Sequence, residues 1–451
     1  MKEVLRHIER LYFIGIGGIG MSALARYAKQ LGLEVAGYDR VRTDLTRALE
    51  TEGISIDYDI NPETLDAGFQ KGESTWAIFT PAVPSTNAYF THFKQWGVPL
   101  MKRAELLGKL TAHTQCLAVA GTHGKTTTSA ILAHLLHQHQ LDFVAFLGGV
   151  SEDFGSNFKM EGHTYSVVEA DEFDRSFLHL HPAHACITHM DADHLDIYGS
   201  STSLEDTYRE FAGQIREGGH LIVREGLPME GLTYGFEPNA DYRLLNLQIV
   251  DGGYQFDFQT PSKTFEGVRY FKPGKHNVLN AAAAWALADQ VCPQADFSAA
   301  LASFKGVERR FSYVVREEEL VLIDDYAHHP TEIDAVFEAV QMWYPEKRTL
   351  AIFQPHLFSR TRDFEAEFAT SLSQFEAVFL MEIYPAREEP IAGVTSAALL
   401  KKISAPTKKV VAREELVDRI KDYQPELLLM LGAGDIGKEV FTVKKALGYE
   451  A

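Results

Sequence analysis

The sequence predicts an α/β protein with doubly wound parallel sheets, divided into three domains. Short apolar runs alternate with segments of helical periodicity over most of the chain, and many runs are followed by glycine or a polar turn. This alternation is typical of parallel strands covered by helices. The chain has 451 residues, and at roughly 150 residues per domain this length accommodates about three domains, each with its own core.

The predicted strands follow one another in chain order, and one region departs from the pattern. Residues 242–250 and 254–259 alternate apolar and polar side chains around Asp251-Gly252-Gly253, which predicts an antiparallel hairpin. The remaining predicted strands are Tyr12–Ile16, Glu34–Tyr38, Ala77–Phe79, Leu117–Ala120, Ser166–Val168, Leu221–Val223, Val321–Ile323, Leu350–Phe353, Val378–Met381 and Leu427–Leu431.

No internal repeat or low-complexity tract marks the domain boundaries. We place one boundary near Leu107–Ala112, before a new strand, and another near Lys305–Ser312, where two arginines precede a new series of strands. The expected domains are therefore residues 1–110, 111–308 and 309–451.

The composition restricts the classes of partner. Lys and Arg number 43 and Asp and Glu 62, which gives a net charge of −19. Nucleic acids and anionic membranes are bound through dense basic patches, so we expect neither as a partner. Small anionic ligands remain compatible with this charge, because backbone N–H groups and a few well-placed cations suffice to hold them.

The cysteines and the N-terminal segment point to the cytoplasm. Cys116, Cys186 and Cys292 are far apart, which excludes a disulfide framework and a cysteine-based zinc site. The first ten residues carry charges of both signs and do not form a secretory signal. The first apolar stretch, Leu11–Ala25, is too short and too rich in glycine to span a membrane.

The first glycine-rich motif predicts a site for a nucleotide diphosphate. It matches G-x-G-x-x-G directly after a strand and opens a helix predicted over Met21–Leu31, and an acidic residue closes the next strand. Glycines there let backbone N–H groups approach a pyrophosphate at a helix N-terminus. Taken alone, the motif suggests an NAD-dependent dehydrogenase. Its candidate ligand-binding residues are Gly15, Gly17, Gly18, Ile19, Gly20 and Asp39.

The second glycine-rich motif predicts an ATP site. It lies between the strand Leu117–Ala120 and a helix predicted over Ser129–His139, and it is a shortened G-x-x-G-K-T loop, because Val119 stands where the usual phosphate loop has its first glycine. In such loops the lysine reaches the β- and γ-phosphates and the threonine hydroxyl binds Mg²⁺. The candidate residues are Gly121, Thr122, His123, Gly124, Lys125, Thr126 and Thr127. The presence of two nucleotide-binding loops suggests that ATP activates a substrate that is itself carried on a nucleotide.

Acidic residues and histidines follow the next predicted strands. Glu169-Ala170-Asp171-Glu172 comes directly after Ser166–Val168, and carboxylates at that strand end face the same crevice as the phosphate loop, where they can hold Mg²⁺. His179, His181, His184, His189 and His194 follow, but their spacing matches no zinc signature. His194, flanked by Asp193 and Asp196, is the best single candidate for a metal or phosphate neighbour.

Taken together and in order, these motifs resemble the Mur ligases, the ATP-dependent ligases of peptidoglycan synthesis. Within that family they are most similar to the members that join L-alanine to UDP-N-acetylmuramate. The resemblance covers essentially the whole chain and depends on the joint spacing of Gly15–Ser22, Gly121–Thr128, Glu169–Glu172, Asp193-His194, His276–Ala282 and Asp324–Glu332.

The resemblance implies a Rossmann-like N-terminal domain that binds the UDP-sugar, a central ATP domain and a Rossmann-like C-terminal domain that helps to admit the amino acid. The first glycine loop then holds a UDP diphosphate instead of NAD. The implied substrates are UDP-N-acetylmuramate, L-alanine and ATP with Mg²⁺, and the protein is expected to be a monomer or a weak homodimer.

The family also implies roles for individual residues. Thr126, Glu169 and His194 match Mg²⁺-linked positions; Asn280, Arg310 and Asp325 match nucleotide contacts; and Tyr326, His328 and Arg360 match positions near the amino acid. Lys125, His194, Arg310 and His328 are the expected catalytic residues, and the residue that takes the proton from the amine is left open among His194, His328 and a nearby carboxylate.

Two features depart from the family pattern. Leu357 follows Pro355-His356 where many members have arginine, which removes one expected contact to the amino-acid carboxylate. Some relatives bridge metals with a carbamylated lysine, but this chain has no lysine between Lys159 and Lys263, so we expect no carbamate.

Three other functions remain open. A related ligase that attaches recycled murein tripeptide to the same UDP-sugar shares these motifs. The dehydrogenase suggested by the first loop would leave the second loop without a purpose. A nucleotide-sensing protein would need the loops but not Glu169 or His194.

Overall fold

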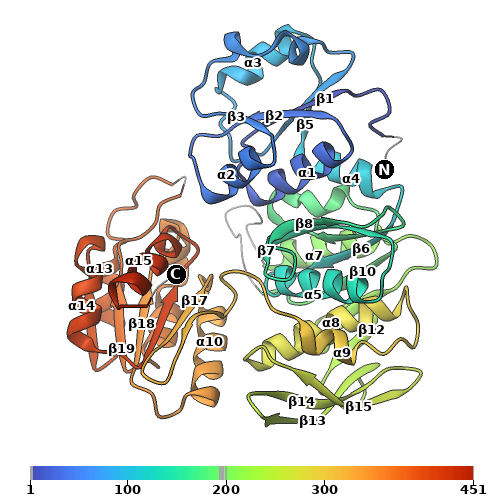
Figure 1. The fold of residues 1–451 in the computed structure, drawn as a ribbon. Helices are drawn as coiled ribbons and strands as arrows, with labels where there is room; N and C mark the ends of the chain where they lie inside the picture. Colours follow the sequence, from blue (N-terminus) through green and yellow to red (C-terminus); the bar gives the residue numbers. More distant parts are fainter. Residues whose placement is uncertain (1–3, 192–197, 199–200, 387, 450–451) are drawn as a thin grey trace. The chain divides into compact units, whose positions relative to one another are not determined.

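The computed structural model describes residues 4–191, 198, 201–386 and 388–449, and the chain forms two compact units (Figure 1). The first unit contains residues 1–271 and 279–305, and the second contains residues 272–278 and 306–451. The predicted boundary at residue 308 lies close to this division, whereas the one at residue 110 lies within a helix of the first unit.

The first unit begins with a parallel sheet of strand order β3-β2-β1-β4-β5. Side chains alternate between its faces, so Leu11 and Phe13 of β1 pack with α1, whereas Tyr12 and Ile14 pack with Tyr89 of α3. The elements are β1 (Arg10–Ile14), α1 (Ile19–Gln30), β2 (Glu34–Tyr38), α2 (Asp44–Thr51), β3 (Ser55–Asp57), η1 (Pro62–Thr64), η2 (Ala67–Gln70), β4 (Thr75–Phe79), α3 (Ala88–Gln95), β5 (Leu100–Lys102) and α4 (Arg103–Thr111).

The same unit continues with a mixed sheet of order β15-β14-β13-β12-β11-β10-β6-β9-β7-β8. Its strands from β12 to β7 are parallel, and β8 and the meander β13–β15 add antiparallel pairs. The elements are β6 (Gln115–Ala120), α5 (Lys125–Gln138), β7 (Phe143–Ser151), β8 (Ser156–Met160), β9 (Tyr165–Glu169), η3 (Phe173–His179), β10 (His184–Ile187), α7 (Ser201–Ala212), β11 (Leu221–Arg224), β12 (Leu232–Gly235), β13 (Tyr242–Val250), β14 (Gly253–Gln259), β15 (Thr264–Tyr270), α8 (Lys275–Asp289) and α9 (Ser298–Ser303).

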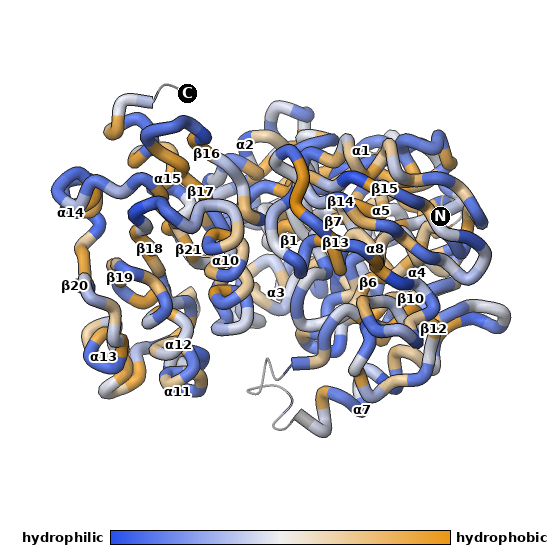
Figure 2. Tube along the Cα trace, turned by 90° about the horizontal axis from the view of Figure 1, so that it is seen from below, coloured by the Kyte–Doolittle hydropathy of each residue, from blue (hydrophilic) through white to orange (hydrophobic). Residues whose placement is uncertain are grey.

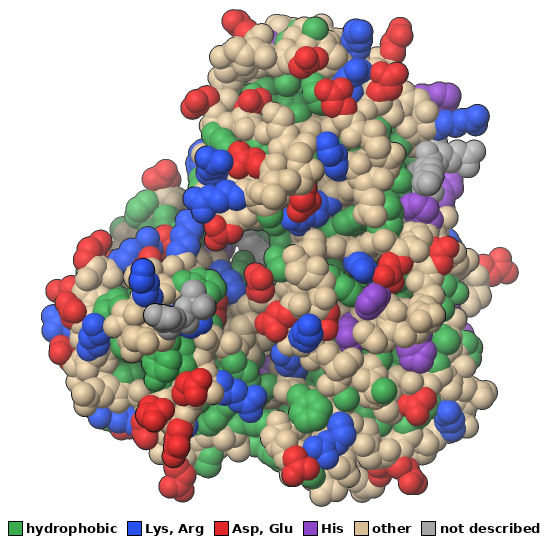
Figure 3. Space-filling view, viewed as in Figure 1, with side chains coloured by type: hydrophobic (Ala, Val, Ile, Leu, Met, Phe, Trp, Pro, Cys, Tyr) green, Lys and Arg blue, Asp and Glu red, His purple; other side chains and the backbone are tan. Residues whose placement is uncertain are grey.

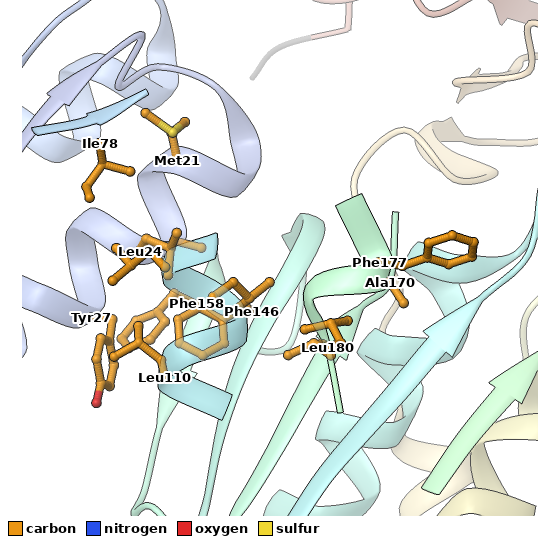
Figure 4. Packing of buried hydrophobic residues seen from close by; sticks show 14 of the residues in the cluster. Met21, Leu24, Tyr27, Ile78, Leu110, Phe146, Phe158, Ala170, Phe177 and Leu180 are labelled. Atoms are coloured by element: carbon orange, nitrogen blue, oxygen red, sulfur yellow. The ribbon is translucent and has the colours of Figure 1, made fainter. Parts of the chain in front are cut away.

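Helix α1 joins the two sheets of the first unit into one core. Tyr27 of α1 packs edge-on against Phe146 of β7 and Phe158 of β8, with ring centroids 5.5 and 6.3 Å apart (Figure 4). Next to them, the buried amide of Asn157 donates to Ser22 Oγ over 2.9 Å and to the Ile19 carbonyl. The start of α1, where the first glycine loop ends, is therefore fixed to the central sheet.

The second unit has the strand order β16-β17-β21-β18-β19-β20, parallel apart from β16 at the edge. Helices α10, α12 and α13 cover one face, and α14 and α15 the other. The elements are β16 (Ser312–Arg316), β17 (Val321–Asp325), α10 (Pro330–Trp343), β18 (Thr349–Phe353), α11 (Phe358–Asp363), α12 (Glu365–Leu372), β19 (Ala377–Leu380), α13 (Ser396–Lys402), β20 (Thr407–Val410), η4 (Arg413–Glu415), α14 (Leu416–Tyr423), β21 (Leu427–Leu431) and α15 (Ile436–Ala446).

Hydropathy and charge follow this architecture. Hydrophobic stretches, orange in Figure 2, run through the interior of each unit, and acidic and basic side chains are interspersed over the face in Figure 3. Within the described ranges, no helix combines the length and apolar character needed to cross a membrane.

The predicted α/β class with parallel sheets and an antiparallel hairpin is confirmed, and three local expectations are corrected. The hairpin gains a third strand, β15, and β7 with β8 form a pair that the sequence patterns did not indicate. Helix α5 begins at Lys125 instead of Ser129, because Gly124 takes the left-handed conformation at its N-cap.

Candidate functional site

The first glycine loop connects β1 to α1 and is held by Asp39 at the end of β2. The Gly17 N–H donates to Asp39 Oδ2 over 2.8 Å, and the Val41 N–H donates to Asp39 Oδ1 over 3.1 Å. Gly15 has a φ of +87°, and Gly18 is the N-cap of α1. Asp39 thus fixes the backbone of the loop, while Gly18, Ile19 and Gly20 line a cavity.

The second glycine loop connects β6 to α5. Gly121 and Gly124 have φ values of +129° and +81°, and a Cβ on Gly121 would lie 2.2 Å from Thr188 Oγ1. The Thr188 hydroxyl donates to the carbonyl of His123, and Thr122 Oγ1 accepts from the N–H of Asp191. The chain after β10 therefore braces the loop, and the N-terminus of α5 at Lys125, Thr126 and Thr127 is the end of a helix that favours phosphate.

Glu169 closes β9 directly beside this loop. The Thr126 hydroxyl donates to Glu169 Oε2 over 2.8 Å, and Glu169 is paired in register with Val119 of β6. A Cβ on Gly148 of β7 would lie 2.0 Å from Glu169 Oε2, so only glycine leaves room for this carboxylate. Sequence reasoning missed Gly148, although a glycine pair inside a strand signals such a close approach.

The pair Thr126 and Glu169 fits a magnesium ion. A hydroxyl and a carboxylate are hard oxygen ligands of the kind that Mg²⁺ takes together with substrate phosphates. His194, the third predicted metal-linked residue, lies outside the described residues, as does Asp193. In the part of the chain that the structure describes, no three His, Cys, Asp or Glu side chains converge to hold an ion.

Lys125 is bound to Glu172, one of the carboxylates that the sequence predicted beside the phosphate loop, although as a neighbour of Mg²⁺ and not as the partner of the lysine. Its Nζ lies 2.9 and 2.8 Å from Glu172 Oε1 and Oε2 and donates to the Gly121 carbonyl over 2.6 Å. Burial alone would lower the pKa of Lys125, but the charges of Glu172, Glu169 and Asp171 raise it above its usual value. Lys125 is therefore a fixed cation at the loop.

A cavity of about 250 Å³ connects the first glycine loop to the strand end that carries Glu169. Gly18, Ile19 and Gly20 line it on one side, and Glu169 and Asp171 line it on the other. Arg103 of α4 supplies the positive charge among the lining side chains, and its Nη2 lies 3.4 Å from Asp171 Oδ2. Sequence reasoning missed Arg103, which no motif marks.

Asn280 also lies at the second loop. A Cβ on Gly124 would be 2.4 Å from Asn280 Oδ1, so the amide of this buried residue of α8 abuts the N-cap of α5. Two of the other histidines after β9 have structural contacts: His184 Nδ1 accepts from the His220 N–H over 3.1 Å, and burial beside Arg224 lowers the pKa of His189 to about 3.

The remaining predicted residues belong to the second unit. Arg310 lies 5.0 Å from the centre of the Tyr326 ring, and the rings of Tyr326 and His328 are 5.3 Å apart. Arg360 is buried in α11. Both oxygens of Asp325 accept backbone N–H groups, from Phe311 and Ala327, over 2.7 Å each, and burial raises the pKa of Asp325 to about 6.

Leu357, the departure from the family pattern, has an uncommon backbone. Its φ of +70° lies in the region that favours glycine, and its carbonyl accepts from the Thr361 hydroxyl over 2.7 Å. Such conformations persist where the surrounding structure holds them and are common at ligand sites. Leu357 stands at the N-cap of α11, the short helix that carries Arg360.

Comparison with known proteins places the whole chain in one family. The family models described as "Mur ligase family, catalytic domain", "Mur ligase middle domain" and "Mur ligase, glutamate ligase domain" match residues 10–115, 119–288 and 309–434. A UDP-N-acetylmuramate–L-alanine ligase of Christiangramia forsetii is 54% identical over 100% of both chains.

Solved structures agree. A UDP-N-acetylmuramate–alanine ligase from Thermotoga maritima superposes with a TM-score of 0.82 at 27% identity, covering 97% of this chain and 99% of that one. A murein peptide ligase from Psychrobacter arcticus, with a TM-score of 0.73, 23% identity and coverage of 98% and 99%, shares the fold. The chain described here belongs to the Mur ligase family.

Proposed function

We propose that this protein is an ATP-dependent ligase that joins the lactyl carboxylate of UDP-N-acetylmuramate to the amine of L-alanine. The observation that carries the proposal is the cavity that runs from the first glycine loop to Glu169, which is hydrogen bonded to Thr126 of the second loop. A sugar nucleotide anchored at Gly18 and Gly20 could thus bring its carboxylate to the place where ATP is held. A full-length relative at 54% identity supports the same activity.

The chemistry requires activation of the carboxylate, because oxide is a poor leaving group. Transfer of the γ-phosphoryl group of ATP to a carboxylate oxygen gives an acyl phosphate and ADP. The alanine amine then attacks the carbonyl carbon, and phosphate leaves with the electron pair of the C–O bond. Phosphoryl transfer asks the protein mainly for positioning and neutralisation of charge.

The first unit supplies most of the groups for phosphoryl transfer. Lys125 and the N-terminus of α5 would hold the phosphates together with Gly121, Thr122, His123, Gly124 and Thr127, and Asn280 would contact the adenine. Thr126, Glu169 and His194 would hold Mg²⁺, which when bound neutralises phosphate charge. Gly15, Gly17 and Asp39 would shape the loop that receives the UDP diphosphate.

The second unit would supply two further contacts to the nucleotide and the groups that receive the amino acid. Arg310 and Asp325 would contact the nucleotide, with Asp325 acting through the backbone of Phe311 and Ala327 that it holds. Tyr326, His328 and Arg360 would receive L-alanine. His194, His328 and a nearby carboxylate remain the candidates for taking the proton from the amine. We further propose a cytoplasmic monomer or weak homodimer.

Phosphate release tests this function. With ATP, Mg²⁺ and UDP-N-acetylmuramate present, release should depend on L-alanine and stop when the UDP-sugar is omitted. Release that prefers murein tripeptide would instead assign the recycling activity, and no release with any acceptor would leave a nucleotide-binding protein. Only binding of a nicotinamide cofactor by this protein would support the alternative of an NAD-dependent dehydrogenase.

A further inference from the structure

The ammonium group of Lys125 has its hydrogen-bonding capacity filled by the protein. An ammonium has three N–H donors. Here Nζ contacts the Gly121 carbonyl at 2.6 Å, Glu172 Oε2 at 2.8 Å and Glu172 Oε1 at 2.9 Å. A phosphate oxygen can therefore bind Lys125 with a normal hydrogen bond only by displacing one of these acceptors.

Glu172 is the acceptor that a phosphate most resembles, because it is an anion held against the same cation. Its side chain is 1% exposed, and the Tyr198 hydroxyl donates to its backbone carbonyl. Burying a carboxylate removes its hydrating water and costs free energy unless the charge is paired. In this site the ion pair with Lys125 compensates for the lost hydration of Glu172. Gly121, by contrast, offers a neutral carbonyl from the loop itself.

We propose that Glu172 is a positioning residue that acts through Lys125: it competes with the nucleotide phosphates for the lysine and so limits the affinity for ATP and ADP. The inference rests on the proposed nucleotide role of the second loop and goes beyond it, because it predicts that the protein binds nucleotide less tightly than its loop permits. The same competition speeds the release of ADP after the reaction.

The surroundings of Lys125 make this proposal testable by neutralising Glu172. Glu169 and Asp171 also act on the ammonium, so it retains negative neighbours when Glu172 becomes glutamine. Glutamine preserves the shape and one acceptor oxygen, but it removes the negative charge that competes with phosphate.

Calorimetric titration with ADP and with a non-hydrolysable ATP analogue, both with Mg²⁺, tests the proposal. Glu172→Gln should bind about tenfold more tightly than the wild type, the size of one charge-assisted hydrogen bond. Glu172→Asp, which keeps the charge but shortens the reach, should give a smaller increase. In steady state the KM for ATP should fall while the KM for UDP-N-acetylmuramate stays unchanged.

Two controls separate competition from a structural role. In a Lys125→Met background, Glu172→Gln should change nucleotide affinity by less than about twofold, because the lysine through which it acts is gone. Glu161→Gln is the matched control: it removes the same charge from a glutamate that lies 3.1 Å from Lys159 Nζ, and it should leave the affinity for nucleotide unchanged. Thermal unfolding verifies that each variant is folded, and Glu172→Asp carries the test if the glutamine variant does not fold.

The outcomes distinguish the two proposals. Unchanged or weaker binding by folded Glu172→Gln, or an equal gain in the Lys125→Met background, would overturn the inference about Glu172 and leave the ligase assignment intact. A wild-type protein that binds neither nucleotide would overturn both.

Discussion

Gly17 and Gly18 are adjacent in the sequence but differ in what surrounds them. A Cβ on Gly17 would lie 2.8 Å from both Asp39 Oδ2 and Thr46 Cγ2, whereas the nearest atom to a Cβ on Gly18 is 3.6 Å away. Gly18 also has a φ of −67°, which any residue adopts. The first glycine loop therefore requires glycine at position 17 for steric reasons and does not require it at position 18.

We predict that Gly17→Ala destabilises the first unit and that Gly18→Ala does not. Displacing Asp39 breaks its bond to the Gly17 N–H, and overpacking of this kind costs about 1–3 kcal/mol. Gly18→Ala should change the free energy of unfolding by less than about 0.5 kcal/mol. Urea unfolding of both variants measures the change in the free energy of unfolding. An equal change in the two variants would show that glycine is not required at position 17 for steric reasons.

Lys125 is the residue on which phosphoryl transfer should depend most. We expect Lys125→Met to lower kcat by at least about a hundredfold, because charge stabilisation at the transferring phosphoryl group is lost. Binding of UDP-N-acetylmuramate, measured by calorimetry, should survive, since Lys125 does not line the cavity at the first loop. Lys109→Met, at an exposed position of α4, is the matched control. Near-normal turnover by Lys125→Met would make the ATP-site assignment wrong.

At the scale of elements, β10 contains a pH-sensitive contact. Burial, with a smaller contribution from His220, lowers the pKa of His184 to about 4, and its Nδ1 accepts the His220 N–H, so the ring is neutral in the folded protein. Because the folded pKa lies below the usual value of about 6.5, the unfolded chain binds the proton more readily. The stability contributed by neutral His184 is complete above pH 6.5 and is lost as the pH falls toward 4.

We predict that His184→Asn reduces the loss of stability between pH 7.5 and pH 5 by about 1 kcal/mol, a value that allows for solvent screening of the half-buried ring. Asparagine keeps an acceptor for the His220 N–H but does not titrate. Urea unfolding at the two pH values gives the difference, with His113→Asn at an exposed position as control. An unchanged pH dependence in His184→Asn would refute the role given to this ring.

The sequence predicted many, but not all, of the strands that are buried on both faces; β10 is buried between β11 and β6 and was not predicted. Strands such as β6, β18 and β21 appear as continuous apolar runs because helices cover both sides of the sheet. The pair β7–β8 was missed, because residues 143–151 follow α5 without a clear turn signal. Strand β15 was missed because its alternation is broken by two consecutive exposed residues, Glu266 and Gly267, where its register with β14 shifts.

The candidate site was predictable only where a local motif marks it. The two glycine loops, Glu169 and Asn280 stand in recognisable patterns. Glu172 was expected beside the phosphate loop, but its pairing with Lys125 across 47 positions was not. Arg103 and Gly148 reach the cavity from separate elements, so only the fold brings them to the site. Asp325 was expected as a nucleotide contact, but the sequence gives no indication that backbone N–H groups bind both of its oxygens.

At the scale of the whole molecule, the hydrophobic cores predict which parts fold alone. The second unit has its own cores on both faces of its sheet, whereas α1 shares one core with β7 and β8 of the central sheet. We therefore expect a fragment of residues 306–451 to unfold cooperatively on its own. A fragment of residues 1–110 should expose Tyr27 and its neighbours and should fail to fold. Thermal unfolding of both fragments tests this, and a stable 1–110 fragment would contradict the shared core.

We expect the cavity to bring the lactyl carboxylate of the UDP-sugar to the γ-phosphate of ATP. The most direct test uses UDP-N-acetylmuramate with both carboxylate oxygens labelled with ¹⁸O, together with ATP, Mg²⁺ and L-alanine. If the carboxylate is phosphorylated, each phosphate released carries one labelled oxygen and the new amide keeps the other. Amide formation with unlabelled phosphate would mean that the carboxylate is activated without accepting the phosphoryl group, and it would overturn the proposed acyl-phosphate route.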